Sequence, residues 1–323
     1  MSLTSRMVVA ASITAALIFA KTRFDDGEHN FDFDSDNPGN RTTEWTWQGT
    51  VPPGQWARIR NLNGAIKVES ATGDELRVVA IKRWSRGDPD YVRIVTNKGD
   101  SDGDVTICAL WGRGGRCDED GYRSRSKRTT FGKMFGGKND VSVLFNVSVP
   151  RGVKLDATTV NGEITILDVG EAVKASTVNG AIKAMTARGP LNASTVNGSI
   201  TARVDSLVGD EGVTLSTVNG SVTAELPDEI NGVIDLSTVN GKFWTNYPVD
   251  APTEKQQRRL HATLGHGGPE LKLSTVNGSV TLKRMVSNHE RTVVRHEEAL
   301  VKHEEAVRKH EQAVVRVQKV VKP

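Results

Sequence analysis

Hydrophobic and polar residues alternate along short stretches of the chain, and these stretches recur at a nearly regular interval. In VKASTVNGAIKAM, which begins at Val173, Val, Ala and Thr alternate with Lys and Ser before an Asn-Gly pair, and Ile and Ala alternate with Lys after it. Alternation with a period of two is typical of a strand with one buried face. The pattern therefore predicts pairs of short β-strands that meet at Asn-Gly, each with a small apolar face and a polar face.

A repeated motif marks this interval. Its strong copies are TTVNGEITI, STVNGAIKA, STVNGSITA, STVNGSVTA, STVNGKFWT and STVNGSVTL, and their asparagines are spaced by 18, 18, 22, 21 and 37 residues. We interpret the last interval as two periods, with one degenerate repeat and a looped-out polar excursion that carries His261 and His266. A weaker copy, IRNLNGAIKVE, centres on Asn63. The predicted turn residues of the strong copies are Asn161, Gly162, Asn179, Gly180, Asn197, Gly198, Asn219, Gly220, Asn240, Gly241, Asn277 and Gly278.

Two all-β architectures are compatible with these repeats. Asn-Gly between alternating strands is a strong hairpin signal, and a series of hairpins would form an antiparallel meander. Alternatively, each period is one coil of a parallel, right-handed β-solenoid, with Asn in the left-handed region at one corner. A hairpin turn gives no reason for Ser or Thr, Thr and Val to precede Asn-Gly in every strong copy. Stacked coils about 4.8 Å apart would align these residues in ladders, so the solenoid is favoured.

The flanking segments divide the chain into regions. Residues 1–20 have the basic start, short apolar run and small final residue of a signal peptide, or else form an N-terminal anchor, and residues 21–40 read as an acidic, disordered linker. Residues 41–150 hold five of the six tryptophans in alternating runs. They predict a β cap over the first open edge of the solenoid at 151–285, with the tryptophans as capping core rather than a sugar-binding platform. The basic segment 113–138 within this region is interpreted as a solvated loop.

The carboxyl-terminal region, residues 286–323, changes to a seven-residue period without Gly or Pro from His289 onward, which predicts a helix. Two interpretations of this helix remain open. It is either a solvated helix with a narrow apolar edge or a coiled-coil seam whose self-association would weaken on protonation of its histidines. One row of the seam is Val293, Leu300, Val307 and Val314, and the other is His289, His296, His303 and His310.

Charge and residue usage exclude several classes of function. Lys and Arg number 42 against 39 Asp and Glu, a balance that does not favour a nucleic-acid partner. Two cysteines are too few for a cysteine-built metal centre, and Cys108 and Cys117 flank a Gly-rich stretch that would let them form a disulfide in an oxidising compartment. Acidic residues occur singly in the repeats, and the common phosphate-binding, dinucleotide-binding and hydrolase motifs are missing. We therefore predict no catalytic residue, no metal site and no cofactor.

The repeated S-T-V-N-G-[SA]-[VI] motif behind a signal-like segment resembles the bacterial β-strand-repeat proteins labelled "putative adhesin", a domain of unknown function, over roughly residues 50–285. The resemblance implies an exported, solenoid-like domain and supplies no binding residues. We predict a non-enzymatic, adhesin-like binding or structural module of the bacterial cell envelope, in the periplasm or at the cell surface. Its partner would be a surface glycan or an envelope protein, its C-terminal helix could form a homo-oligomer, and only an uncleaved N-terminal segment would contact the membrane. The alternative is a self-assembling envelope scaffold that polymerises through the ends of the solenoid and the C-terminal helix.

Overall fold

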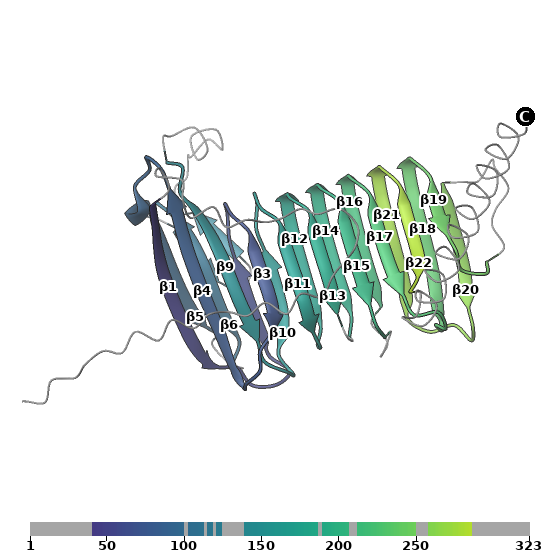
Figure 1. Cartoon of the computed structure of the whole chain (residues 1–323), viewed down its shortest axis with the longest axis horizontal. Helices are drawn as coiled ribbons and strands as arrows, with labels where there is room; N and C mark the ends of the chain where they lie inside the picture. The colour runs from purple at the N-terminus through teal and green to yellow at the C-terminus, as the bar shows by residue number, and fades with distance from the viewer. Residues whose placement is uncertain are drawn as a thin grey trace, which may run out of the picture. The chain divides into compact units, whose positions relative to one another are not determined.

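The computed structural model describes residues 41–99, 103–112, 115–118, 121–124, 139–186, 189–206, 212–249 and 258–285. These residues form two mixed ten-stranded β-sheets and a two-stranded ribbon (Figure 1), so the all-β prediction is confirmed for them. Sheet A contains, in spatial order, β1 (Arg41–Thr50), β4 (Glu75–Trp84), β9 (Ser142–Val149), β3 (Ile66–Ser70), β11 (Ile164–Val169), β13 (Ile182–Thr186), β15 (Ile200–Val204), β17 (Val222–Leu226), β22 (Val280–Arg284) and β19 (Phe243–Thr245). Sheet B contains β20 (Arg259–Leu264), β18 (Gly232–Asn240), β21 (Glu270–Asn277), β16 (Val213–Asn219), β14 (Leu191–Asn197), β12 (Val173–Asn179), β10 (Lys154–Thr158), β2 (Trp56–Arg60), β6 (Val105–Trp111) and β5 (Val92–Lys98). The ribbon pairs β7 (Gly115–Asp118) with β8 (Gly121–Ser124), and a 3-10 turn covers Pro89–Tyr91.

Each strong repeat supplies one strand to each sheet. The residues up to the asparagine form a strand of sheet B and those after the glycine form a strand of sheet A, as in β12 and β13. Neighbouring copies pair in parallel with like residues opposite each other, so that Ser194 lies between Ser176 and Ser216. A hairpin at Asn-Gly would instead pair β12 with β13 in one antiparallel ladder. The meander alternative is therefore wrong for these repeats.

Alternation within the strands places the apolar core between the two sheets. In β12 and β14 the first, third and fifth residues are buried and the residues between them face outward. Burying one Ile, Leu or Val side chain contributes about 1.5–3 kcal/mol, so these rows are the main source of stability in the repeats. The core rows, each residue at most 1% exposed, are Ile164, Ile182, Ile200, Val222 and Val280 from sheet A and Leu155, Val173, Leu191, Val213 and Leu271 from sheet B.

The last repeats have a spatial order that differs from their order in the chain. Strand β21, from the final copy, pairs with β16 on one side and β18 on the other. In Figure 1 the yellow strand β21 lies between the green strands β16 and β18. After β18 the chain forms β19 in sheet A and then the edge strand β20, which pairs antiparallel with β18, before β21 takes the inner position. The prediction of a degenerate repeat in the 37-residue interval is thus wrong. The sheet B strand within that interval, β20, includes His261 and pairs antiparallel with its neighbour, whereas the repeats pair in parallel.

Antiparallel strands form three of the four ends of the two sheets, while β19 at the remaining end of sheet A pairs in parallel with β22. At the N-terminal end, β4 pairs antiparallel with both β1 and β9 in sheet A, and β5 pairs antiparallel with β6 in sheet B. The prediction that the aromatic residues of this region are core is confirmed for four tryptophans, which pack against the main core, while Trp56 faces outward from β2. The four are Trp45, Trp47, Trp84 and Trp111.

The ribbon of β7 and β8 lies inside the segment that was interpreted as a solvated loop. Cys108 in β6 and Cys117 in β7 are joined by a disulfide. Both cysteines are buried in a small apolar cluster with Leu110, against which Tyr122 packs. The loop interpretation is therefore wrong for residues 115–118 and 121–124, because the disulfide and this cluster hold them against β6 as strands.

Several predicted features lie outside the described residues. They are the signal peptide or anchor at 1–20, the linker at 21–40 and the helix at 286–323 with its histidine row. In the part of the chain that the structure describes, no helix has the length and apolar character needed to cross a membrane.

Candidate binding face

The outer face of sheet B carries rows of like side chains and is the candidate functional site. In β14 the outward residues are Asn192, Ser194 and Val196. Because the neighbouring strands are in register, the serines and the valines of successive motifs line up across the sheet. The serine row consists of Ser176, Ser194, Ser216, Ser274 and Ser237, and the valine row consists of Val178, Val196, Val218, Val276 and Val239.

The valine row leaves an apolar stripe at the surface. Its side chains are between 38% and 52% exposed. Single exposed apolar residues are normal on proteins, whereas adjacent ones mark an interaction surface. Hydroxyl groups lie beside the stripe, with the Oγ atoms of Ser176 and Ser194 only 3.1 Å apart. The face therefore offers hydroxyl and methyl groups at the regular spacing of β-strands, about 4.8 Å.

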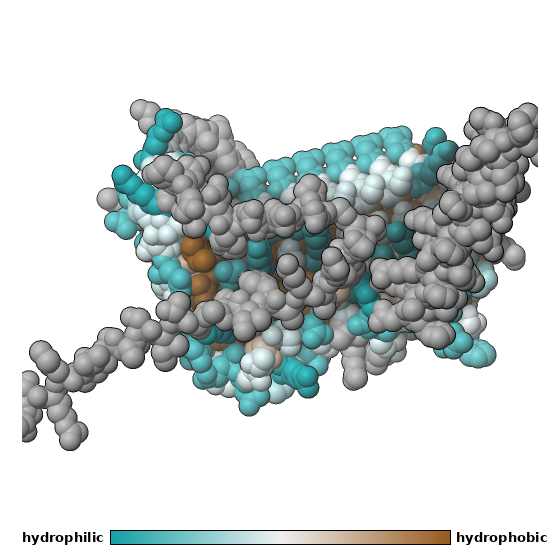
Figure 2. Space-filling model, in the orientation of Figure 1, coloured by the Kyte–Doolittle hydropathy of each residue, from teal (hydrophilic) through white to brown (hydrophobic). Residues whose placement is uncertain are grey.

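Asparagine side chains form a hydrogen-bonded ladder where the strands of sheet B end. Figure 2 shows a straight hydrophilic row along this edge. Each Nδ2 donates to the Oδ1 of the adjacent rung over 2.8–2.9 Å, and the rungs follow the spatial order of the strands. The order of the rungs is Asn161, Asn179, Asn197, Asn219, Asn277 and Asn240.

The threonine of each motif joins neighbouring repeats inside the turn. Thr195 Oγ1 donates to the carbonyl oxygen of Gly180 over 3.0 Å, and Thr217 Oγ1 donates to that of Gly198 over 2.9 Å. Both threonine side chains are only 5% exposed. A buried carbonyl group without a donor is costly, so a hydroxyl at this position is required. This bond recurs at Thr159, Thr177, Thr238 and Thr275.

Each motif needs a glycine because the backbone of the neighbouring repeat leaves no room for a Cβ atom. A Cβ atom on Gly198 would lie 1.9 Å from the carbonyl oxygen of Gly180, and one on Gly180 would lie 1.9 Å from that of Gly162. The prediction that asparagine takes the left-handed conformation is wrong. Among the described non-glycine residues, only Asp168 has a positive φ. The Asn-Gly pair thus allows neighbouring turns to stack closely, and its asparagine does not adopt the left-handed conformation.

A cluster of cationic side chains surrounds Trp56 on the same outer face. The centroid of a Trp56 ring lies 4.7 Å from Lys174 Nζ, 5.7 Å from Lys154 Nζ and 5.9 Å from Arg58 Cζ. These residues come from three adjacent strands, β2, β10 and β12, and strand alternation points all of them outward. At such distances the negative face of the indole ring attracts a cation.

The arginines and the lysines of this cluster differ in their partners. Arg58 pairs with Asp104 at 2.6 Å and Arg60 pairs with Asp156 at 2.7 Å. Among the described residues, Lys154 and Lys174 take part in no ion pair. Two carboxylates nevertheless lie near the lysines, because Asp156 is opposite Lys174 on the adjacent strand and Asp104 interacts electrostatically with Lys154. With two arginines and two lysines against these two carboxylates, the cluster keeps a net positive charge.

Asp104 is held by Trp56 as well as by Arg58. It accepts a hydrogen bond of 2.8 Å from the Trp56 backbone N–H. Burial alone would raise the pKa of the Asp104 carboxyl, but the Trp56 N–H, the Arg58 guanidinium and the positive charge of Lys154 outweigh it, and the pKa is lowered. This cluster was not predicted from the sequence, although alternation in WARIR places Trp56, Arg58 and Arg60 on one face of the strand.

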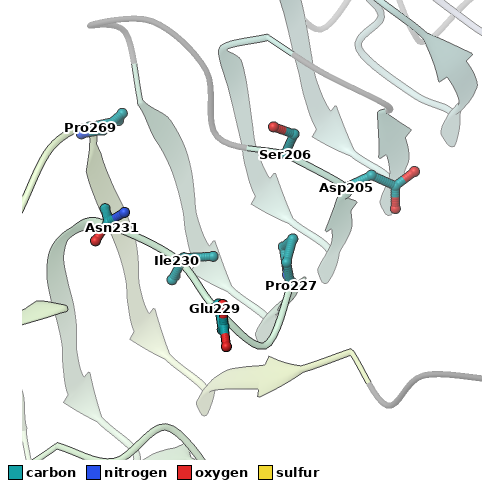
Figure 3. A pocket seen from close by; sticks show the side chains of 7 residues that line it. All are labelled: Asp205, Ser206, Pro227, Glu229, Ile230, Asn231 and Pro269. Carbon is teal, nitrogen blue, oxygen red and sulfur yellow. The ribbon is translucent and has the colours of Figure 1, made fainter. Parts of the chain in front are cut away.

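A small polar pocket of about 360 Å³ lies among the turns that lead from sheet A to sheet B (Figure 3). The carboxylates of Asp205 and Glu229 point in different directions in this view, so they do not form a pair for acid–base chemistry. Asn231 Oδ1 accepts a hydrogen bond of 2.9 Å from the His266 backbone N–H. The lining residues are Asp205, Ser206, Pro227, Glu229, Ile230, Asn231 and Pro269.

The two histidines of the polar excursion, His261 and His266, lie in and directly after β20. His261 lies in β20 opposite Asp235, and His266 lies in the turn that follows this strand. Among the described residues, no three His, Cys, Asp or Glu side chains come together in a way that could hold a metal ion.

Comparison with known proteins gives distant structural similarity only. No protein-family model and no curated protein matches the chain. The chain is similar to a "putative cell adhesion protein" from Clostridium sporogenes, with 11% identity, a TM-score of 0.38 and coverage of 75% of this chain and 100% of the other. A "putative adhesin" from Bacteroides fragilis has 10% identity, a TM-score of 0.27 and coverage of 75% and 97%. A "putative lipid binding protein" from Parabacteroides distasonis has 9% identity, a TM-score of 0.26 and coverage of 77% and 98%. At these values, no residue role or ligand transfers to this chain.

Proposed function

We propose that this protein is an exported, non-enzymatic binding module of the bacterial cell envelope that contacts its partner through the outer face of sheet B. The observation that carries the proposal is the in-register repetition of serine and valine side chains across five strands of that face. A rigid array of hydroxyl and methyl groups can hold a partner by hydrogen bonds and packing at many equivalent points. None of these groups transfers a proton near neutral pH, which fits adhesion better than catalysis.

The proposal includes a β-solenoid as the scaffold of this face. Consecutive repeats alternate between the two sheets and return to the first sheet in parallel, as β12, β13 and β14 do. Parallel strands joined by such a crossover are almost always connected with right-handed topology, which supports the right-handed form. A solenoid keeps every copy of the motif on the same side of the stack, and a flat recognition face needs that arrangement.

The alternative function, an envelope scaffold that polymerises end to end, has less support. The outer strand β19 of sheet A pairs in parallel with β22. The other three outer strands, β1 in sheet A and β5 and β20 in sheet B, run antiparallel to their neighbours. Such strands do not continue the parallel, in-register pairing of the repeats. Association through residues 286–323 is a separate mode of assembly and is compatible with the proposed binding module.

The test of the proposed function is binding of the fluorescently labelled full chain to cells of the source bacterium. Ser216→Glu, in the centre of the serine row, should abolish binding, because it places a longer, negatively charged side chain on the face. Thr201→Glu on the exposed side of sheet A is the matched control and should bind like the unaltered protein. Equal binding by both variants would overturn the assignment of this face.

Export has its own test. Cell fractionation combined with N-terminal sequencing of the mature protein should find it outside the cytoplasm, either with the first 20 residues removed or with an intact N-terminal anchor. Recovery of the full-length chain in the soluble cytoplasm would contradict the proposal.

A further inference from the structure

We infer that the cluster around Trp56 is a binding site for the anionic groups of an acidic polysaccharide. The inference rests on the proposed function and names the class of ligand that the outer face of sheet B recognises. The site consists of Trp56, Lys154 and Lys174, supported by Arg58 and Asp104.

The charge of the cluster is the first argument. The carboxylates of Asp104 and Asp156 neutralise Arg58 and Arg60. Lys154 and Lys174 approach the same indole ring from different strands, so their like charges converge. An anion beside the ring would relieve this repulsion and would gain charge-assisted hydrogen bonds from both ammonium groups.

The rigidity of the cluster is the second argument. Asp104 fixes the start of β2 through the Trp56 backbone N–H and also holds the Arg58 guanidinium. Parallel pairing places Lys154 directly opposite Trp56 on the adjacent strand. The start of β2, the Arg58 guanidinium and the strand position of Lys154 are thus fixed before a ligand arrives, which reduces the conformational entropy lost on binding.

The remainder of the face favours a polysaccharide over nucleic acid. The position of Lys174 is taken by Asn192 in β14 and by Thr214 in β16, so the strands next to the cluster present amide and hydroxyl groups. A nucleic acid carries a charge on every phosphate and would need continued basic side chains along its path. A polysaccharide with anionic groups at intervals matches one cationic cluster followed by hydroxyl rows. The flat faces of its sugar rings also suit contact with an aromatic side chain and with the valine stripe.

The experiment measures binding of the full chain to dextran sulfate, to uncharged dextran of the same length, to polygalacturonate and to a single-stranded DNA oligonucleotide, by calorimetry at low and high salt. We expect binding to at least one of the two anionic polysaccharides, no measurable binding to dextran, and weaker binding at high salt. Lys174→Gln and Lys154→Gln should each weaken binding about tenfold, as expected for loss of one charge-assisted hydrogen bond.

Lys283→Gln is the matched control. Lys283 is an exposed residue of β22 in sheet A and therefore lies outside the proposed binding face. The substitution changes the net charge equally, so binding should not change. A Trp56→Leu variant should also lose binding, and its thermal unfolding reports whether the fold is retained. The lysine variants test the site even if that variant unfolds.

Three outcomes would overturn the inference. They are equal losses for Lys283→Gln and Lys174→Gln, binding to neither anionic polysaccharide, and tighter, Lys174-dependent binding to DNA than to the polysaccharides. The proposed function would survive each of these results if Ser216→Glu still abolished attachment to cells, so the two failures can be distinguished.

Discussion

A threonine and a glycine from neighbouring repeats form the smallest structural unit of the stack. The Thr195 hydroxyl donates to the Gly180 carbonyl, and Gly198 leaves room for that same carbonyl on the adjacent turn. The two requirements explain why the motif tolerates Glu, Ala, Ser or Lys after the glycine but keeps Thr and Gly in every strong copy. Asparagine adds a third contact through its side-chain ladder.

Substitution of Gly198 by alanine should destabilise the stack strongly. The new Cβ would lie 1.9 Å from the Gly180 oxygen, and the neighbouring backbone cannot move without disturbing the next repeat. Overpacking of this kind costs about 3 kcal/mol in free energy of unfolding. Gly170→Ala is the control, because a Cβ there has no neighbour within 4 Å. Urea denaturation of both variants measures the difference, and equal midpoints would contradict the steric argument.

Substitution of Thr195 by valine tests the buried hydroxyl. Valine has nearly the same shape but leaves the Gly180 carbonyl without this donor, so the free energy of unfolding should fall by about 1–3 kcal/mol. Thr195→Ser keeps the hydroxyl and should recover part of the loss. Thr201→Val on the exposed side of β15 should change stability by less than about 0.5 kcal/mol. An unchanged free energy of unfolding in Thr195→Val would show that this hydrogen bond makes no net contribution to stability.

We expect Asp104 to make the free energy of unfolding depend on pH under acidic conditions. Because the pKa of its carboxyl is below the ordinary value of 3.8 in the folded protein, the ionised form stabilises the fold above that pH. This contribution is lost as the pH falls through the lowered pKa. Asp104→Asn should therefore be less stable than the unaltered protein near neutral pH, and the difference in free energy of unfolding should shrink as the pH falls further and further below 3.8. Asp74→Asn, at an exposed turn, controls for the loss of a negative charge; a pH-independent gap for Asp104→Asn would contradict the linkage.

At the scale of elements, the disulfide is the covalent link between the ribbon and sheet B. Cys108 lies in β6 and Cys117 in β7, with nine residues of sequence separation. Closing a loop of that length stabilises the folded state by about 2.5 kcal/mol relative to the open chain. We therefore expect the Cys108→Ala, Cys117→Ala double variant to unfold at lower urea concentration.

Hydrogen exchange locates the effect of that double variant. The amides of β7 and β8 should lose protection, while those of the central strand β14 should keep it. Reductant should lower the stability of the unaltered protein toward that of the double variant and leave the double variant unchanged. Unaltered protection in β7 and β8 would show that apolar packing alone holds the ribbon.

The elements that could be predicted from the sequence are those specified locally. Alternation around Asn-Gly predicts the paired strands, and the recurrence of Ser, Thr and Val before it favours pairing between like residues. The order of the strands could not be predicted. The copies at Ser216, Ser237 and Ser274 are nearly identical, so each could neighbour either of the others. The Trp56 cluster was missed because Lys154 and Lys174 reach the ring only after three strands from distant parts of the sequence pair.

At the scale of the whole molecule, the repeats cannot all take their final neighbours in the order of the chain. In the folded protein Asn219 is hydrogen-bonded to Asn277, although Asn240 is closer in sequence and belongs to an equivalent motif. Early in folding, β18 can therefore pair with β16 in an acceptable register. That pairing must open before β21 inserts between them. Non-local pairing is slow in general, and a competing local pairing should slow it further.

Cysteine pairs can report this exchange of neighbours. In the folded protein, adjacent parallel strands are about 4.8 Å apart, so Asn219→Cys with Asn277→Cys should cross-link readily. Asn219→Cys with Asn240→Cys spans two strand spacings, about 9.6 Å, which is too far for a disulfide. Both double variants lose two rungs of the asparagine ladder, so they are matched in that respect. In a refolding time course with oxidant added at intervals, the second pair should cross-link only at early times. Cross-linking of that pair in the folded protein would contradict the strand order, and its absence at all times, together with a single fast refolding phase, would contradict the competing pairing.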